Sequence, residues 1–188
     1  MTILARPLTE SEYEREAKDL FWTVFQSEDP YGEPLSPAMT HRVILCPYQY
    51  ELEPNELRAL AAAIRAVGDS GFYYSVTERP SDPRVPDLRS GYWHWYVPLE
   101  DLEAYHDRVR TPPFENALYS PTGQWGIIFS DEQHAVVGGN RVFIDTLLAG
   151  LSTSWEEQAR EFVDICRYWR DHYHTPVLEW LQTLLVPV

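Results

Sequence analysis

The clearest alternation of hydrophobic and polar positions lies between residues 114 and 148. Trp125, Ile127 and Phe129 alternate with smaller residues, so three large side chains share one face of a predicted strand. Residues 120–123 (SPTG) form a turn before it, because Pro suits the second turn position and Gly the fourth. We therefore predict an antiparallel hairpin at this point, with another strand before the turn.

The same stretch continues into a third strand and then changes period. Residues 135–137 are a short apolar run that ends at two glycines. From Phe143 onward the apolar residues recur at helical spacing, with Asn140 or a neighbour as the cap. The prediction is a three-stranded antiparallel meander that leads into a helix.

Three further helices are predicted from caps and apolar stripes. Thr9 and Glu12 form a capping box before an apolar face that reaches Val24. Pro54 suits a first helical turn, and Gly68 suits the end of that helix. The longest stripe predicts a helix near the C-terminus, and it consists of Trp155, Ala159, Phe162, Cys166, Trp169 and Tyr173.

Further strands and irregular segments complete the pattern. β-Branched or aromatic alternation predicts strands at residues 42–46, 72–77 and 92–97. Residues 27–40 hold three prolines, and we expect them to cross the surface. Residues 78–91 also hold three prolines, and a long loop of this kind in a compact domain often carries function. The predicted fold is a single α+β domain spanning residues 1–188, with a mainly antiparallel sheet of about six strands covered by amphipathic helices.

The charge balance limits the classes of partner. The chain of 188 residues has 29 acidic and 15 basic side chains and a net charge of −14. Such a surface repels phosphate backbones, which argues against nucleic acid, but it can attract a basic protein. Solubility alone is the alternative explanation for the acidity. No apolar run approaches the ~20 residues that span a bilayer, so we expect no membrane association.

The two cysteines, Cys46 and Cys166, are too few for a disulfide scaffold and lie in apolar patterns. We therefore expect buried free thiols and a cytoplasmic location.

Candidate chemistry gathers at the second turn of the meander. Asp131, Glu132 and His134 lie in that turn, and Glu115 is expected nearby across the strands. Carboxylates beside a histidine can perform acid–base catalysis, although turns are polar in any protein. The sequence contains no glycine-rich phosphate loop and no GxSxG, HExxH or CxxC motif. These four residues therefore define an alternative catalytic interpretation.

His172 and His174 raise the question of a metal site. On a helix, residues two positions apart point in different directions, so this pair is poorly placed to share a metal ion. A histidine near a helix C-terminus is also favoured by the helix dipole. We predict neither a metal site nor a cofactor.

Aromatic side chains occupy both faces of two predicted strands. Tyr73, Tyr92, His94 and Tyr96 share the character of protein-recognition surfaces, in which tyrosine is enriched. Two interpretations stay open, since these side chains either complete the core under a helix or border a binding face.

The segments GFYYSVTERP, ENALYSP and WGIIFSDEQHAVVGG, the last followed by a helix, resemble uncharacterised bacterial proteins associated with the immunity proteins of polymorphic toxin systems. The resemblance covers roughly residues 71–148. It implies a small acidic α+β protein that neutralises a cognate toxin by direct binding. A non-catalytic protein-binding protein is thus the leading interpretation, and a small-molecule-binding protein or hydrolase with a pocket near residues 130–134 is the alternative.

Overall fold

The computed structural model describes residues 4–45, 52–78, 93–109, 114–130, 134–151 and 155–173. The strands are β1 (Arg6–Leu8), β2 (His41–Leu45), β3 (Gly71–Val76), β4 (His94–Pro98), β5 (Asn116–Tyr119), β6 (Trp125–Phe129) and β7 (Ala135–Gly139). The α-helices are α1 (Glu10–Glu16), α2 (Lys18–Val24), α3 (Pro54–Ala66), α4 (Arg141–Gly150) and α5 (Trp155–Tyr173). A short 3₁₀-helix, η1 (Leu99–Asp101), and a π-helical turn, η2 (Tyr105–Val109), lie between β4 and β5.

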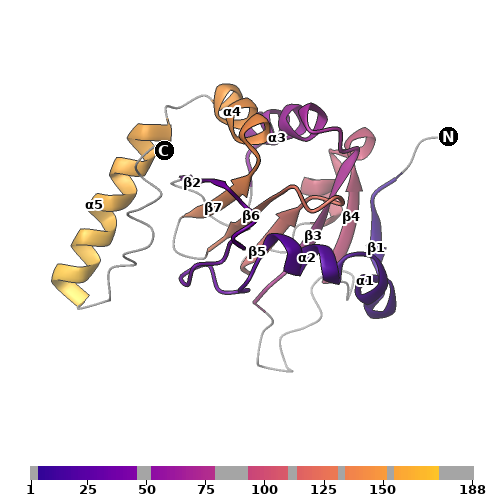
Figure 1. Ribbon diagram of the computed structural model, residues 1–188, viewed down its shortest axis with the longest axis horizontal. Coiled ribbons are helices and arrows are strands. Elements are labelled where there is room, and N and C mark those ends of the chain that lie inside the picture. The colour runs from indigo at the N-terminus through magenta and orange to yellow at the C-terminus, as the bar shows by residue number, and fades with distance from the viewer. Residues whose placement is uncertain are drawn as a thin grey trace.

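One antiparallel sheet organises the chain, with the strand order β1-β4-β3-β5-β6-β7-β2 (Figure 1). The α+β class is confirmed, and the meander β5–β6–β7 forms as predicted, with Ile127 opposite both Leu118 and Val137. The sheet has seven strands within the described residues, against the six or so expected. The strand that sequence reasoning missed is β1, which has only three residues and a central proline and so shows no alternation.

Strand β1 closes one edge of the sheet. It pairs with β4 through Pro7, which lies opposite Trp95. Proline has no N–H to offer a further strand, and short edge strands resist edge-to-edge pairing. The N–H of Ala5 is already bound to the Asp101 carboxylate at 2.7 Å. This edge is therefore protected against further strand addition.

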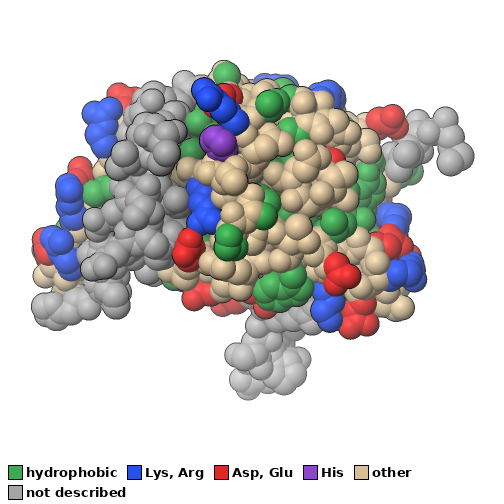
Figure 2. Space-filling model, in the orientation of Figure 1, with side chains coloured by type: hydrophobic (Ala, Val, Ile, Leu, Met, Phe, Trp, Pro, Cys, Tyr) green, Lys and Arg blue, Asp and Glu red, His purple; other side chains and the backbone are tan. Residues whose placement is uncertain are grey.

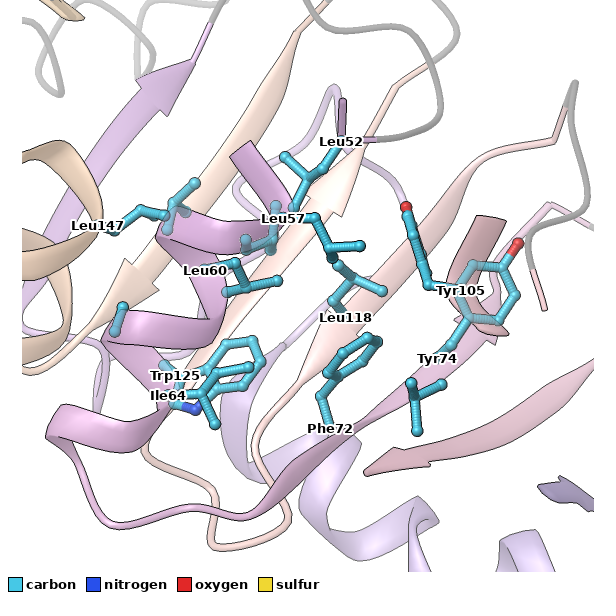
Figure 3. Packing of buried hydrophobic residues seen from close by; sticks show 14 of the residues in the cluster. Leu52, Leu57, Leu60, Ile64, Phe72, Tyr74, Tyr105, Leu118, Trp125 and Leu147 are labelled. Atoms are coloured by element: carbon cyan, nitrogen blue, oxygen red, sulfur yellow. The ribbon is translucent and has the colours of Figure 1, made fainter. Parts of the chain in front are cut away.

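Helices α3 and α4 cover one face of the sheet, at the top of Figure 1. Their apolar stripes meet the side chains at one alternating set of strand positions, including Phe72, Tyr74, Leu118 and Trp125 (Figure 3). Trp125 stacks on Phe143 of α4 with the ring centroids 4.7 Å apart. The predicted face shared by Trp125, Ile127 and Phe129 thus belongs to the larger of two hydrophobic cores, one on each face of the sheet.

Helices α1 and α2 cover part of the opposite face. Thr9 and Glu12 form the predicted capping box, in which the Glu12 carboxylate accepts the Thr9 N–H at 2.8 Å. The single helix expected here is interrupted at Ala17, where φ is −125° and ψ is −29°. Tyr13 and Phe21 lie on either side of this interruption, and both are buried against the sheet. Together with the strand side chains on this face they form the second, smaller hydrophobic core.

The segment after α2 corrects one expectation. Residues 27–40 do not simply cross the surface, because Leu35 and Met39 are buried in the second core. Phe25 forms an isolated bridge with Leu35, and a Cβ at Gly138 would approach Leu35 to 2.8 Å. The glycine lets this segment lie directly on β7. The prolines exclude a helix, but they do not keep the segment away from the core.

The local signals at element ends act as predicted. Gly68 follows α3 with φ at +82°, and Asn140 caps α4 by accepting the Phe143 N–H at 2.9 Å. In the turn between β5 and β6, the Gly123 N–H donates to the Ser120 carbonyl at 3.2 Å.

Helix α5 forms, and its predicted stripe is buried at Phe162 (1% exposed) and half-buried at Cys166 and Trp169. Cys166 is not joined in a disulfide, and its side chain is half-buried rather than fully buried. The side chains of Trp155, Ala159 and Tyr173, together with Cys46, lie outside the described part of the chain.

Candidate functional site

The aromatic side chains Tyr73, His94 and Tyr96 of β3 and β4 lie on the face of the sheet that α1 covers. Tyr73 is opposite Tyr96, with the ring centroids 5.4 Å apart in an edge contact. Tyr73 is 9% exposed, and burial, followed by the nearby charge of Glu16, raises the pKa of its hydroxyl. Tyr96 is half-buried, and its hydroxyl lies 3.4 Å from the Ser70 Oγ.

His94 belongs to a buried polar chain. Its ring stacks on Tyr13 of α1 with the centroids 3.6 Å apart, and its Nδ1 lies 2.8 Å from the Ser75 Oγ. Ser75 in turn lies 3.0 Å from the Tyr119 hydroxyl. Burial raises the pKa of Tyr119 well above its ordinary value, so the phenol keeps its proton at neutral pH. These contacts join α1 to three neighbouring strands.

The burial of this chain changes how the aromatic strands can be used. Tyr73 and His94 lie under α1, and they offer a partner almost no surface. Tyr96 keeps a partly accessible ring, and Tyr92 lies outside the described residues. Of the two interpretations of these strands, the structure places Tyr73 and His94 in the core.

The second turn of the meander contains a close serine–histidine contact. The Ser130 Oγ lies 2.7 Å from the His134 Nδ1, and both residues are fully buried. The His134 Nε2 lies 3.3 Å from the Pro30 carbonyl, which can only accept a hydrogen bond. Nε2 therefore carries the proton in the neutral ring, and the Ser130 hydroxyl has two acceptors within reach, the closer Nδ1 and the His134 carbonyl oxygen at 3.1 Å. Phe162 of α5 lies against the His134 ring, with the centroids 4.9 Å apart.

The remaining members of the proposed acid–base cluster are only partly placed. Glu115 is half-buried just before β5, and its carbonyl accepts the Thr77 N–H at 2.9 Å. Asn116 pairs with Phe129, so continuing the register puts Glu115 opposite Ser130. Asp131 and Glu132 lie outside the described residues. The structure thus brings Glu115, Ser130 and His134 to one end of neighbouring strands, with His134 sealed from solvent.

A buried aspartate that sequence reasoning missed ties the first turn of the meander to α3. Asp69 is 7% exposed, and its Oδ2 accepts the Ser120 hydroxyl at 2.7 Å and the Trp125 Nε1–H at 2.9 Å. Its Oδ1 accepts the Thr122 hydroxyl at 2.8 Å. More than fifty residues separate Asp69 from these donors, and no local pattern signals the contact. The arrangement satisfies every donor that it gathers, as a structural network does.

The N-terminal layer carries an unbalanced surface charge. Residues 4–45 hold eight carboxylate side chains and four basic ones. All four basic side chains are in ion pairs: Arg6 with Glu12 and Glu16, Arg15 with Glu16, Lys18 with Glu14, and Arg42 with Glu33. Asp19, Glu28 and Asp29 are exposed and form no ion pair within the described residues. Figure 2 shows acidic and basic side chains intermixed at the end of the molecule around α1.

His172 lies on the exposed side of α5. Its ring stacks on Tyr168 with the centroids 4.0 Å apart, and its Nδ1 donates to the Tyr168 carbonyl at 2.9 Å. His174 lies outside the described residues. Within the described ranges, no three His, Cys, Asp or Glu side chains are grouped as a metal site requires.

The described helices include none with the length and apolar character needed to cross a membrane. Comparison with known proteins found no matching family model, no matching curated protein and no matching solved structure.

Proposed function

We propose that this chain is a protein-binding protein that captures a basic partner through its acidic surface. The observation that carries the proposal is the charge of the N-terminal layer. Every basic side chain there is already paired, while Asp19, Glu28 and Asp29 stay exposed without an ion pair in the described structure. Such carboxylates steer a cationic protein toward the surface and speed its association.

The resemblance of residues 71–148 to proteins associated with toxin immunity supplies a class for that partner. An immunity protein neutralises its cognate toxin by direct binding, which requires recognition and no catalytic centre. A toxin with a basic surface is a suitable partner for a chain of net charge −14. The proposal is therefore an immunity-type protein, with a basic toxin as its partner.

The test starts from isolation of the partner. Proteins bound to the tagged chain in its cell of origin are identified by mass spectrometry, and the complex is then reassembled from purified components. We expect added salt to slow association more than it speeds dissociation, because steering acts on the encounter. An association rate that does not change between low and high salt would contradict the proposal.

A second candidate function rests on the Ser130–His134 contact. A serine hydroxyl that donates to a histidine is the arrangement that activates a nucleophile in hydrolases. The 2.7 Å contact favours this candidate, while the complete burial of both residues opposes it. A fluorophosphonate probe that labels Ser130, but not a Ser130→Ala variant, would support hydrolase chemistry. An unlabelled protein would remove this candidate.

A further inference from the structure

Helix α2 exposes a tryptophan. Trp22 is 45% exposed, whereas Phe21 and Val24 of the same helix are buried in the second core. Another side of α2 faces the turn between β5 and β6, since a Cβ at Gly123 would lie 3.1 Å from Thr23. With those sides packed, Trp22 points outward, and its ring makes an edge contact with Phe21 at 5.1 Å between centroids. In Figure 2, hydrophobic atoms reach the surface in the area of α2.

An exposed carboxylate stands beside this tryptophan. Asp19 precedes Trp22 by three residues, and side chains at that spacing are neighbours on a helix surface. Asp19 is exposed and forms no ion pair within the described residues. Lys18, the nearest basic side chain along the helix, is paired with Glu14 at 3.4 Å. The loop after α2 adds Glu28 and Asp29, which also form no ion pair in the described structure. The surface thus combines an aromatic ring with negative charge.

We propose that Trp22 and Asp19 form an anchor for an arginine side chain of the basic partner, an inference that rests on the proposed function. The flat guanidinium stacks on the indole face and donates hydrogen bonds to the Asp19 carboxylate. Arginine suits this pair better than lysine, because its planar group stacks on aromatic rings and matches a carboxylate with two parallel donors. The net charge of −14 supplies the attraction that brings such a partner to the surface.

The experiment uses a defined probe in place of the partner. The full-length protein, labelled with ¹⁵N, is titrated with an end-blocked (Arg-Gly)₄ peptide, its lysine analogue and its neutral citrulline analogue. We expect the arginine peptide to shift the Trp22 indole and Asp19 amide signals most, the lysine peptide less, and the citrulline peptide least. Trp22→Ala should lower the affinity for the arginine peptide about two- to fivefold, the range for an exposed cation–π contact. Asp19→Asn should lower the same affinity by a similar factor.

Two variants elsewhere on the surface serve as matched controls. Tyr168→Ala removes a ring of comparable exposure from α5, and Asp145→Asn removes one exposed carboxylate from α4. Neither should change the affinity by more than about a third, since Tyr168→Ala changes no charge and Asp145→Asn acts only on the general electrostatic field.

Equal effects of all four variants, or no binding of the peptide, would overturn the Trp22 anchor. The proposed function would then be tested by the salt dependence of the reassembled complex alone. If Trp22→Ala instead abolishes a concentration-dependent dimer seen by sedimentation, a second copy of the chain occupies this surface and the inference is wrong.

Discussion

The Asp69 network makes a prediction that separates hydrogen bonding from simple burial. Replacing Asp69 with alanine removes the acceptor of three donors. Trp125 is fully buried, so its indole N–H would be left without an acceptor, whereas the buried Ser120 hydroxyl can turn toward the Thr122 Oγ1, 2.9 Å away, and Thr122 is exposed and can be solvated. An unsatisfied buried donor costs about 1–3 kcal/mol, and the loss of a hydrogen bond to a charged group costs about 1.5–3 kcal/mol, so the change should lower the free energy of unfolding by about 2.5–6 kcal/mol.

Asparagine at the same position should be much milder. Its amide oxygen can replace Oδ2 and keep both buried donors, while its NH₂ group faces the Thr122 Oγ1 in place of Oδ1. The Thr122 hydroxyl can turn its proton toward the Ser120 Oγ, 2.9 Å away, and accept from the amide. What is lost is the charge assistance, which accounts for about half the strength of such bonds. We expect Asp69→Asn to cost about 1–2 kcal/mol.

Equilibrium urea unfolding of both variants, followed by tryptophan fluorescence, measures the two costs. Hydrogen exchange of the Trp125 indole N–H provides a local readout, which should accelerate strongly in Asp69→Ala and only modestly in Asp69→Asn. Asp145→Asn on the exposed side of α4 is the control and should stay within about 0.5 kcal/mol of the parent. Equal costs for alanine and asparagine, or a cost below about 1 kcal/mol for alanine, would refute the reasoning.

Three further predictions concern packing, capping and close approach. Phe162→Ala should cost about 3–5 kcal/mol through a cavity under α5, measured by urea unfolding and by faster amide exchange along that helix. The Thr9 hydrogen bonds lower the Glu12 pKa below 4.5, so they stabilise the fold above that pH and lose their effect as pH falls. Glu12→Gln should therefore make stability fall less steeply between about pH 5 and pH 3, measured by urea midpoints across that interval. Gly126→Ala should cost about 1–3 kcal/mol in the same assay, since the new Cβ would overlap a Val24 methyl.

Side-chain periodicity predicts the elements of this chain better than it predicts what covers them. The alternation along β6 assigns Trp125, Ile127 and Phe129 to one face, and the structure places all three in the larger core. The alternation along β4 likewise separates Trp95 from His94. Alternation alone does not show whether the face with His94 meets solvent or a helix. That depends on Tyr13, which lies far away in sequence and stacks on the histidine ring.

The other features that the sequence did not predict have related causes. Strand β1 is too short to show a period, and it forms because β4 offers a partner. The burial of Leu35 depends on the absence of a side chain at Gly138, about a hundred residues later. The Asp69 network likewise joins residues that share no local pattern. For the candidate site, sequence reasoning located a polar turn at His134 but could not predict that Phe162 would seal it.

The strand order also determines when the two edges of the sheet can form. Strands β1 and β2 both come from the first 45 residues, yet one pairs with β4 and the other with β7, at opposite edges. As the chain leaves the ribosome, β2 has no partner strand until residues 135–139 have also been made. In the same way, the apolar side of α1 has no surface to pack on until β4 has been made, and that of α2 has none until β5 and β6 have been made. Residues 4–45 are thus synthesised before the strands on which they pack. Their apolar surface therefore stays accessible to chaperones until those strands have been made.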